Sequence, residues 1–203
     1  MKTVKLLGAL ASAACLFAAT QAAAVTVVGA TRIEVRTLTG DFMQIAEIEA
    51  IEAGTLDNVA ASANGGAGVS SSNGFGTTAG LAIDGNDDSA FGGGSVWHSG
   101  PGDANAFYFL TLGRTATLAS LRMVGRSDVI TFRDIYDVKI FNAANNVLYA
   151  GVLDARGATH EATVTFDLPP PGAIPEPSTW AMMILGFGAA GAAIRSRRRA
   201  VLA

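Results

Sequence analysis

The chain has 203 residues, of which 50% are hydrophobic and only 15% are charged, and its net charge is −3 at pH 7. This composition is too apolar for a disordered chain, and the charge balance excludes a strongly basic nucleic-acid-binding protein. The single cysteine, Cys15, excludes an intramolecular disulfide framework and a cysteine-based zinc cluster. Because 24 residues are glycine and only 7% are aromatic, a turn-rich β protein is favoured over a helical bundle.

Residues 1–24 are predicted to form a secretory signal peptide. Two lysines precede an apolar run over residues 6–19, and small residues follow at 22–24. A basic start, an apolar middle and an A-x-A end are typical of such signals, with cleavage expected after Ala24. The alternative is a short buried helix. Cleavage would remove Cys15 and leave the exported chain without a thiol.

Residues 25–168 alternate between apolar and polar residues in several short stretches, as β-strands do. Segments rich in Gly, Asn, Asp and Ser separate these stretches, and the number of short strands predicts an all-β fold, an antiparallel jelly-roll β-sandwich. Three isoleucines within residues 44–53 have helical spacing, so the pattern alone leaves this segment open between helix and strand. The expected strands are, in chain order, 31–36, 107–112, 118–125, 137–140, 147–149 and 162–168.

The C-terminal region is predicted to be a spacer followed by a membrane segment. Residues 169–178 hold five prolines, which is typical of a linker. An apolar run of about 15 residues follows within 179–203, somewhat below the ~20 that cross a bilayer comfortably. Trp180 would lie at one membrane interface, and the basic tail would hold the other end in the cytoplasm. The residues of interest are Pro175, Glu176, Pro177, Trp180, Arg195, Arg197, Arg198 and Arg199.

This order of features resembles the PEP-CTERM sorting signal of Gram-negative bacteria. The resemblance implies transient insertion into the inner membrane, processing near the Pro-Glu-Pro by an integral-membrane exosortase, and a final location at the cell surface or outside the cell. A permanent tail anchor is the alternative. Residues 25–174 carry 8 basic and 16 acidic residues. This excess of acids disfavours nucleic acid as a partner and leaves neutral sugars, cations or basic surfaces.

Much of residues 31–155 is similar to discoidin-like domains. The similar stretches are 41–49, 82–86 with 96–99, 110–113 and 121–128. The resemblance implies a discoidin-like jelly roll and assigns a strand to the ambiguous segment 44–53. In that family the strand with the sequence Gln-Ile-Ala-Glu-Ile usually closes the domain, whereas here it comes first, which implies a permuted strand order.

The loop 81–89 offers oxygen ligands at short spacing, and calcium takes 6–8 such oxygens. Many discoidin-like domains bind a structural calcium ion with this loop, so the resemblance implies calcium as a cofactor. The alternative is an Asp-Gly turn with solvated acids. The implied ligands are the carbonyl groups of Ala46, Glu47, Leu81 and Asn86, the carboxylate of Asp84, and the hydroxyl or carbonyl of Ser89.

Residues 126–133 have the pattern Arg-x-Asp-x4-Arg. This pattern resembles the fucose-binding motif of F-type lectins, a branch of the discoidin-like fold. The resemblance implies that His98, Arg126 and Arg133 hydrogen-bond sugar hydroxyls while Asp128 holds the arginines. Arginine forks donate paired hydrogen bonds, and histidine can accept or donate one. The 27 residues between His98 and Arg126 are more than the lectin pattern has, and its cysteine pair is absent. The alternative is a structural Arg126–Asp128 ion pair with His98 capping a turn.

No catalytic motif is found in the sequence. The chain has two histidines and neither a Gly-x-Ser-x-Gly nor a His-Glu-x-x-His sequence, so no enzymatic activity is expected. Trp97 and Tyr108 could stack on a sugar ring, although for Trp97 a place in the core is favoured, and His160 is predicted to be solvated. The sequence therefore favours an exported protein that binds carbohydrate or exopolysaccharide. The alternatives are a structural matrix protein without specific glycan binding and a membrane-tethered glycan hydrolase.

Overall fold

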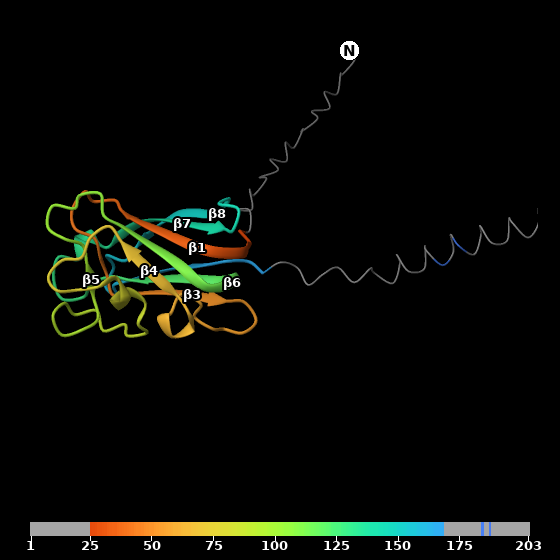
Figure 1. Ribbon diagram of the computed structural model, residues 1–203, viewed down its shortest axis with the longest axis horizontal. Coiled ribbons are helices and arrows are strands. Elements are labelled where there is room, and N and C mark those ends of the chain that lie inside the picture. The colour runs from red at the N-terminus through yellow and green to blue at the C-terminus, as the bar shows by residue number, and fades with distance from the viewer. Residues whose placement is uncertain (1–24, 169–183, 185–186, 188–203) are drawn as a thin grey trace, which may run out of the picture.

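The computed structural model describes residues 25–168, together with Ile184 and Phe187. Residues 25–168 form a β-sandwich with nine strands and three short 3-10 helices (Figure 1). The all-β prediction is therefore confirmed. The strands are β1 Val27–Thr37, β2 Gln44–Ile45, β3 Glu47–Glu52, β4 Ala67–Ser70, β5 Trp97–His98, β6 Phe107–Val124, β7 Ile135–Asn142, β8 Val147–Asp154 and β9 Glu161–Thr165, and the helices are η1 Ser62–Asn64, η2 Ala79–Ile83 and η3 Thr131–Arg133.

Strand β6 is the central strand of the large sheet, since four other strands pair with it. The strand order is β3-β6-β1-β7-β8, and β4 and β9 also pair with β6, while β2 and β5 form a separate two-stranded sheet. All of these pairs are antiparallel. The two strands predicted over 107–112 and 118–125 are one strand in the structure, so this division was wrong. The segment between them continues the strand, and Gly113 within it allows η1 to approach closely, since a Cβ on Gly113 would lie 1.9 Å from the Asn64 carbonyl oxygen.

The segment 44–53 forms strands β2 and β3, which confirms the strand assignment. Gln44 pairs with His98 of β5, whereas Glu47 pairs with Val124 of β6. The chain changes partners at Ala46, and this break shifts the phase of the alternation. Ile45 and Ile48 are therefore both fully buried although they are three residues apart. The spacing of three between Ile45 and Ile48, which suggested a helix, therefore results from the break between β2 and β3.

The core lies between the large sheet and the strands and loops packed on it. In β1 the apolar Ile33 is fully buried, as the predicted alternation requires. Trp97 is also fully buried, which confirms its predicted place in the core, and its ring centroid lies 5.3 Å from that of Tyr108. The hydroxyl of Tyr108 donates a hydrogen bond to the Ala79 carbonyl oxygen at 2.7 Å. Tyr108 is fully buried, so the expectation that it could stack on a sugar was wrong.

The two ends of the sandwich differ in what they carry. The Asp167 N–H donates to the Val25 carbonyl oxygen at 3.0 Å, so the chain enters and leaves the domain at neighbouring points. Most of the long loops lie at the opposite end, near β5 (Figure 1). The predicted signal peptide 1–24, the spacer 169–178 and, apart from Ile184 and Phe187, the membrane segment 179–203 fall outside the described residues. Within the part of the chain that the structure describes, no helix is long and apolar enough to cross a membrane.

Candidate functional site

His98 lies in a cluster of three phenylalanine rings at the loop-bearing end of the sandwich. It follows the core residue Trp97 in β5, and successive strand residues point to opposite faces. Its ring centroid lies 5.1 Å from that of Phe42, 4.8 Å from that of Phe75 and 5.4 Å from that of Phe91. The three rings come from three separate loops, and they leave His98 only 3% exposed.

Arg126 lies on one side of this cluster. Its guanidinium carbon is 4.5 Å from the ring centroid of Phe91, a favourable cation–π geometry. The guanidinium also forms a two-pronged ion pair with Asp128, with Nη2 2.9 Å from Oδ2. The hydrogen bonds from Arg126 hold the pKa of Asp128 well below its usual range. The side chain of Arg126 is thus fixed by a ring and a carboxylate.

Arg133 contacts the same cluster in an equivalent arrangement. Its guanidinium carbon is 4.7 Å from the ring centroid of Phe42, and its Nη2 is 3.0 Å from Oδ2 of Asp41. Phe42 contacts both Arg133 and His98, and Phe91 contacts both Arg126 and His98. Each arginine therefore contacts a phenylalanine ring that itself contacts His98.

The contacts of His98 define its protonation. Nδ1 lies 2.8 Å from the Ser99 carbonyl oxygen, and because a carbonyl can only accept, Nδ1 carries the hydrogen. Burial lowers the pKa of His98 below its ordinary value, and the positive charges of Arg133 and Arg126 act in the same direction. The ring is therefore favoured in its neutral form, with the lone pair of Nε2 free to accept a hydrogen bond.

The arrangement combines fixed donors, an acceptor and an apolar surface. Two arginine forks donate, His98 Nε2 accepts, and each arginine has a carboxylate partner that balances its charge. Phe75 and Phe132 are 62% and 55% exposed, so apolar surface is available beside the polar groups. The arrangement can therefore offer hydrogen-bond donors, one acceptor and an apolar surface to a ligand.

The sequence motif identified only part of this site. His98, Arg126, Asp128 and Arg133, all singled out in the sequence, lie together. The phenylalanines and Asp41 were missed because they come from loops that no spacing rule connects. Trp97 and Tyr108 lie in the core instead. His160, predicted to be solvated, is half-buried, and within residues 25–168 its Nδ1 has no hydrogen-bond partner.

A buried carboxylate, Asp134, lies beneath the site. It is fully buried and accepts a hydrogen bond from the backbone N–H of Arg126 at 2.9 Å. A second hydrogen bond comes from Nε2 of Gln44 at 3.0 Å. Burial raises the pKa of Asp134 from 3.8 to about 7, since the low-dielectric interior disfavours the charged form.

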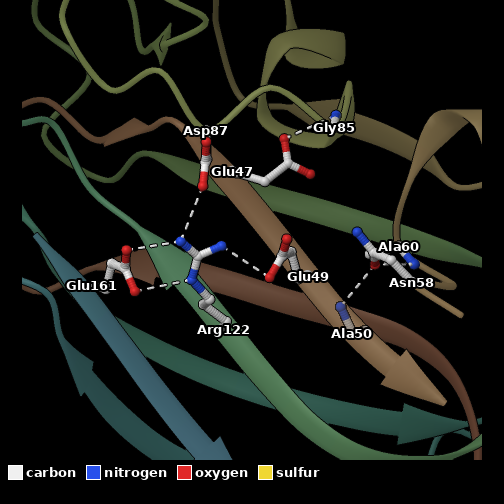
Figure 2. A network of polar contacts seen from close by, with 9 residues as sticks. All are labelled: Glu47, Glu49, Ala50, Asn58, Ala60, Gly85, Asp87, Arg122 and Glu161. Carbon is white, nitrogen blue, oxygen red and sulfur yellow. Dashed lines mark hydrogen bonds and ion pairs between the residues drawn. The ribbon is translucent and has the colours of Figure 1, made fainter. Parts of the chain in front are cut away.

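Glu47 and the loop 84–89 form a second group of oxygens (Figure 2). Glu47 is 1% exposed, and its Oε2 accepts the Gly85 N–H at 3.2 Å. Its Oε1 is buried and has no hydrogen-bond partner among residues 25–168. Burial raises the pKa of Glu47 to about 8, and the nearby charge of Asp84 adds to this effect. A buried carboxylate oxygen without a partner is costly, and a cation would satisfy it.

The other implied calcium ligands lie around this loop but make hydrogen bonds of their own. Asp84 accepts the Asn86 N–H at 2.9 Å, and Ser89 accepts the Ser127 N–H through its carbonyl oxygen at 2.9 Å. The Leu81 carbonyl is 3.4 Å from the Ser95 hydroxyl, and the Ala46 N–H donates to β6. Within the described residues, no three His, Cys, Asp or Glu side chains are grouped as metal ligands. A cation here would need backbone carbonyl oxygens.

Arg122 ties this loop to the sheet (Figure 2). Its guanidinium contacts Glu49 of β3 at 3.0 Å, Glu161 of β9 at 2.8 Å and Asp87 of the loop at 3.2 Å. Asp87 therefore has an ion-pair partner, although both Asp87 and Asp88 are exposed. The loop is anchored from one side by Arg122 and from the other by Glu47.

Comparison with known families concerns the other end of the chain. The family model of the PEP-CTERM protein-sorting motif matches residues 173–199. The chain carries a PEP-CTERM sorting motif. This motif indicates export across the inner membrane, processing by an exosortase, and a surface or extracellular location. Comparison with curated proteins and with solved structures finds no match. The predicted sorting residues, from Pro175 to Arg199, lie outside the described residues.

The buried charge of Asp134 predicts a pH-dependent effect of Asp134→Asn on stability. The folded chain binds this proton more tightly than the unfolded chain, so the stability contributed by the group falls as the pH rises from about 4 to about 7. Asparagine does not titrate. Between pH 5 and pH 8 the free energy of unfolding of the variant should therefore rise, relative to the wild type, by about 1–3 kcal/mol.

Urea unfolding at both pH values, with EDTA present, measures this difference. Asp154→Asn is the matched control, because the exposed Asp154 has a lowered pKa that places its titration below this pH range. If the difference in unfolding free energy between Asp134→Asn and the wild type were equal at pH 5 and pH 8, the raised pKa of Asp134 would be contradicted.

Proposed function

We propose that this exported protein binds neutral carbohydrate at the cell surface or in the extracellular matrix, through a discoidin-like domain of the F-type lectin kind. The observation that carries the proposal is the grouping of His98 with two arginines that are each held by a carboxylate and by a phenylalanine ring in contact with His98. This group is already ordered by contacts within the protein, which lowers the entropic cost of binding. The proposal assigns no catalytic step to the site.

The chemistry of recognition follows from the protonation of these groups. Arg126 and Arg133 would donate hydrogen bonds to sugar hydroxyls, and Nε2 of His98 would accept one from a hydroxyl between them. The exposed ring of Phe75 would pack against a C–H face of the sugar. Because Asp128 and Asp41 already balance the arginine charges, an anionic sugar would gain little and would meet repulsion from these carboxylates.

A structural calcium ion is part of the proposal. The support is the buried, unpartnered Oε1 of Glu47 beside Asp84, together with the loop carbonyls that a calcium shell uses. The side chain of Glu47, rather than only its carbonyl, is the favoured ligand. The ion would stabilise the loop whose Ser89 carbonyl holds the Ser127 N–H, next to Arg126. Calcium would thus support the sugar site without touching the sugar.

Removal of either arginine is expected to abolish most of the glycan binding. Loss of a hydrogen bond to a charged group costs about 1.5–3 kcal/mol, so Arg126→Ala and Arg133→Ala should each weaken binding at least about tenfold. The measurement is a glycan array, followed by calorimetric titration of the best glycan, with the protein spanning residues 25–174. Arg114→Ala is the matched control, because Arg114 pairs with Glu52 and Asp57 on exposed surface away from the site.

The alternatives give distinct outcomes in the same experiment. An array on which the wild type binds nothing would overturn carbohydrate recognition and favour a structural matrix protein. Release of products from any glycan would instead favour a hydrolase. Equal losses in the Arg114→Ala control would show that the effect is not specific to the site.

Calcium is expected to raise the thermal midpoint of the wild type and to have a smaller effect on Glu47→Gln. An amide oxygen is a weaker ligand than a carboxylate for a hard cation, and ligand binding to the folded state raises stability by mass action. Thermal unfolding in calcium chloride and in EDTA measures the shift. Glu34→Gln, which alters an ion pair with Arg36 in β1, is the control. An identical midpoint with and without calcium would contradict the metal site.

The sorting motif predicts that C-terminal processing by the exosortase depends on the Pro-Glu-Pro sequence. Replacement of Pro175, Glu176 and Pro177 by alanine should leave an uncut precursor in the inner membrane, because the exosortase would lose its recognition sequence. Fractionation and mass spectrometry of the C-terminus detect the precursor. Unchanged processing of the altered chain would count against recognition of these residues.

A further inference from the structure

We propose that Asp134 is a positioning residue for the carbohydrate site, because its buried carboxylate joins the chain segments that carry Arg126, Arg133 and His98. This inference rests on the proposed function for its consequence on sugar binding. The carboxylate of Asp134 would not touch the sugar, and it makes no hydrogen bond to the side chains of His98, Arg126 or Arg133. It acts on the backbone and on the supporting amide of Gln44.

The first contact fixes the start of the 126–133 loop. Oδ2 of Asp134 accepts the backbone N–H of Arg126 at 2.9 Å. The preceding residue must be glycine, since a Cβ on Gly125 would lie 2.6 Å from the carboxyl carbon of Asp134. Arg133 immediately precedes Asp134 in the chain. One buried carboxylate therefore sets the positions from which both arginine side chains leave the backbone.

The second contact extends this link to His98. Nε2 of Gln44 donates to Oδ1 of Asp134 at 3.0 Å and to the carbonyl oxygen of Ile130 at 3.0 Å. Gln44 is the ladder partner of His98 in the β2–β5 sheet. Ile130 is held in the left-handed region, at φ 62°, a conformation that costs energy for a β-branched residue. The amide of Gln44 thus connects the strand of His98 to a strained point of the arginine loop.

A third residue completes the buried network. The hydroxyl of Tyr136 donates to the Gln44 carbonyl oxygen at 2.7 Å and lies 3.4 Å from Oδ1 of Asp134. Tyr136 is fully buried at the start of β7. The network therefore joins β2, β7 and the loop after β6, which are far apart in the sequence.

The energetics favour a role in positioning over a role in stability. A buried carboxylate is costly because desolvation disfavours its charge, and the raised pKa of Asp134 reflects this cost. The carboxylate instead fixes two groups in position, the backbone N–H of Arg126 and the side-chain amide of Gln44. A binding site needs its groups held to within about 0.5 Å, which demands such supporting contacts.

Comparison of Asp134→Ala with Asn58→Ala tests this inference. Asn58 also accepts two backbone N–H groups, those of Ala50 and Ala60, at 3.0 and 3.1 Å (Figure 2). It lies beside β3, outside the site, and so provides a matched loss of hydrogen bonds. Both variants should unfold at lower urea concentration than the wild type. Only Asp134→Ala should also shift the NMR signals of the His98 ring and the Arg126 guanidinium.

The sugar arm of the experiment uses L-fucose as the probe, with the protein spanning residues 25–174. Asp134→Ala should weaken binding at least about tenfold, and Asn58→Ala less than twofold. Asp134→Asn keeps an acceptor for the Arg126 N–H, so its affinity should lie between those of the wild type and Asp134→Ala. If Asp134→Ala does not fold, the L-fucose affinities of Asp134→Asn and Asn58→Ala are compared instead, and a weaker affinity of Asp134→Asn supports the positioning role.

The outcomes separate this inference from the proposed function. Unchanged His98 and Arg126 signals in the Asp134 variants, or equal shifts in Asn58→Ala, would overturn the positioning role. If the wild type binds no L-fucose while the signals shift as expected, the sugar assignment fails for this probe and the positioning role stands. If the wild type binds and the Asp134 variants bind equally well, the positioning role fails and the sugar site stands.

Discussion

The pairing of each site arginine with a carboxylate is the interaction on which the site depends. Without Asp128 and Asp41, two guanidinium groups near the buried His98 would repel one another and attract any anion. With these partners the charges balance and the arginine forks are held in place. The phenylalanine rings reduce contact with water and keep His98 neutral. The proposed recognition of neutral hydroxyl ligands rests on this whole group, since no single member of it would specify such a ligand.

The sequence predicted the regular part of the fold and the polar centre of the site, for different reasons. Alternation along β1 and β9 follows from the period of a strand, so those elements could be identified directly. The continuity of β6 could not be identified from the sequence, because the close packing of η1 against Gly113 leaves no local sequence pattern. The resemblance to the motif of F-type lectins grouped Arg126, Asp128 and Arg133. Nothing local marked Phe75 or Asp134, because loop closure and burial bring them to the site.

The position of the site relative to the chain ends agrees with the sorting motif. The domain begins and ends at neighbouring points, joined by the hydrogen bond between Asp167 and Val25, and the loops of the site lie at the far end (Figure 1). A chain held during sorting through its C-terminal segment would therefore present His98 and its arginines away from the point of attachment.

The most direct test of this account is a crystal structure of residues 25–174 with the best-binding glycan from an array. The account predicts sugar hydroxyls within hydrogen-bond distance of Arg126, Arg133 and Nε2 of His98, with a C–H face against Phe75. A glycan bound on another surface, with this group of side chains left in contact with solvent alone, would contradict it.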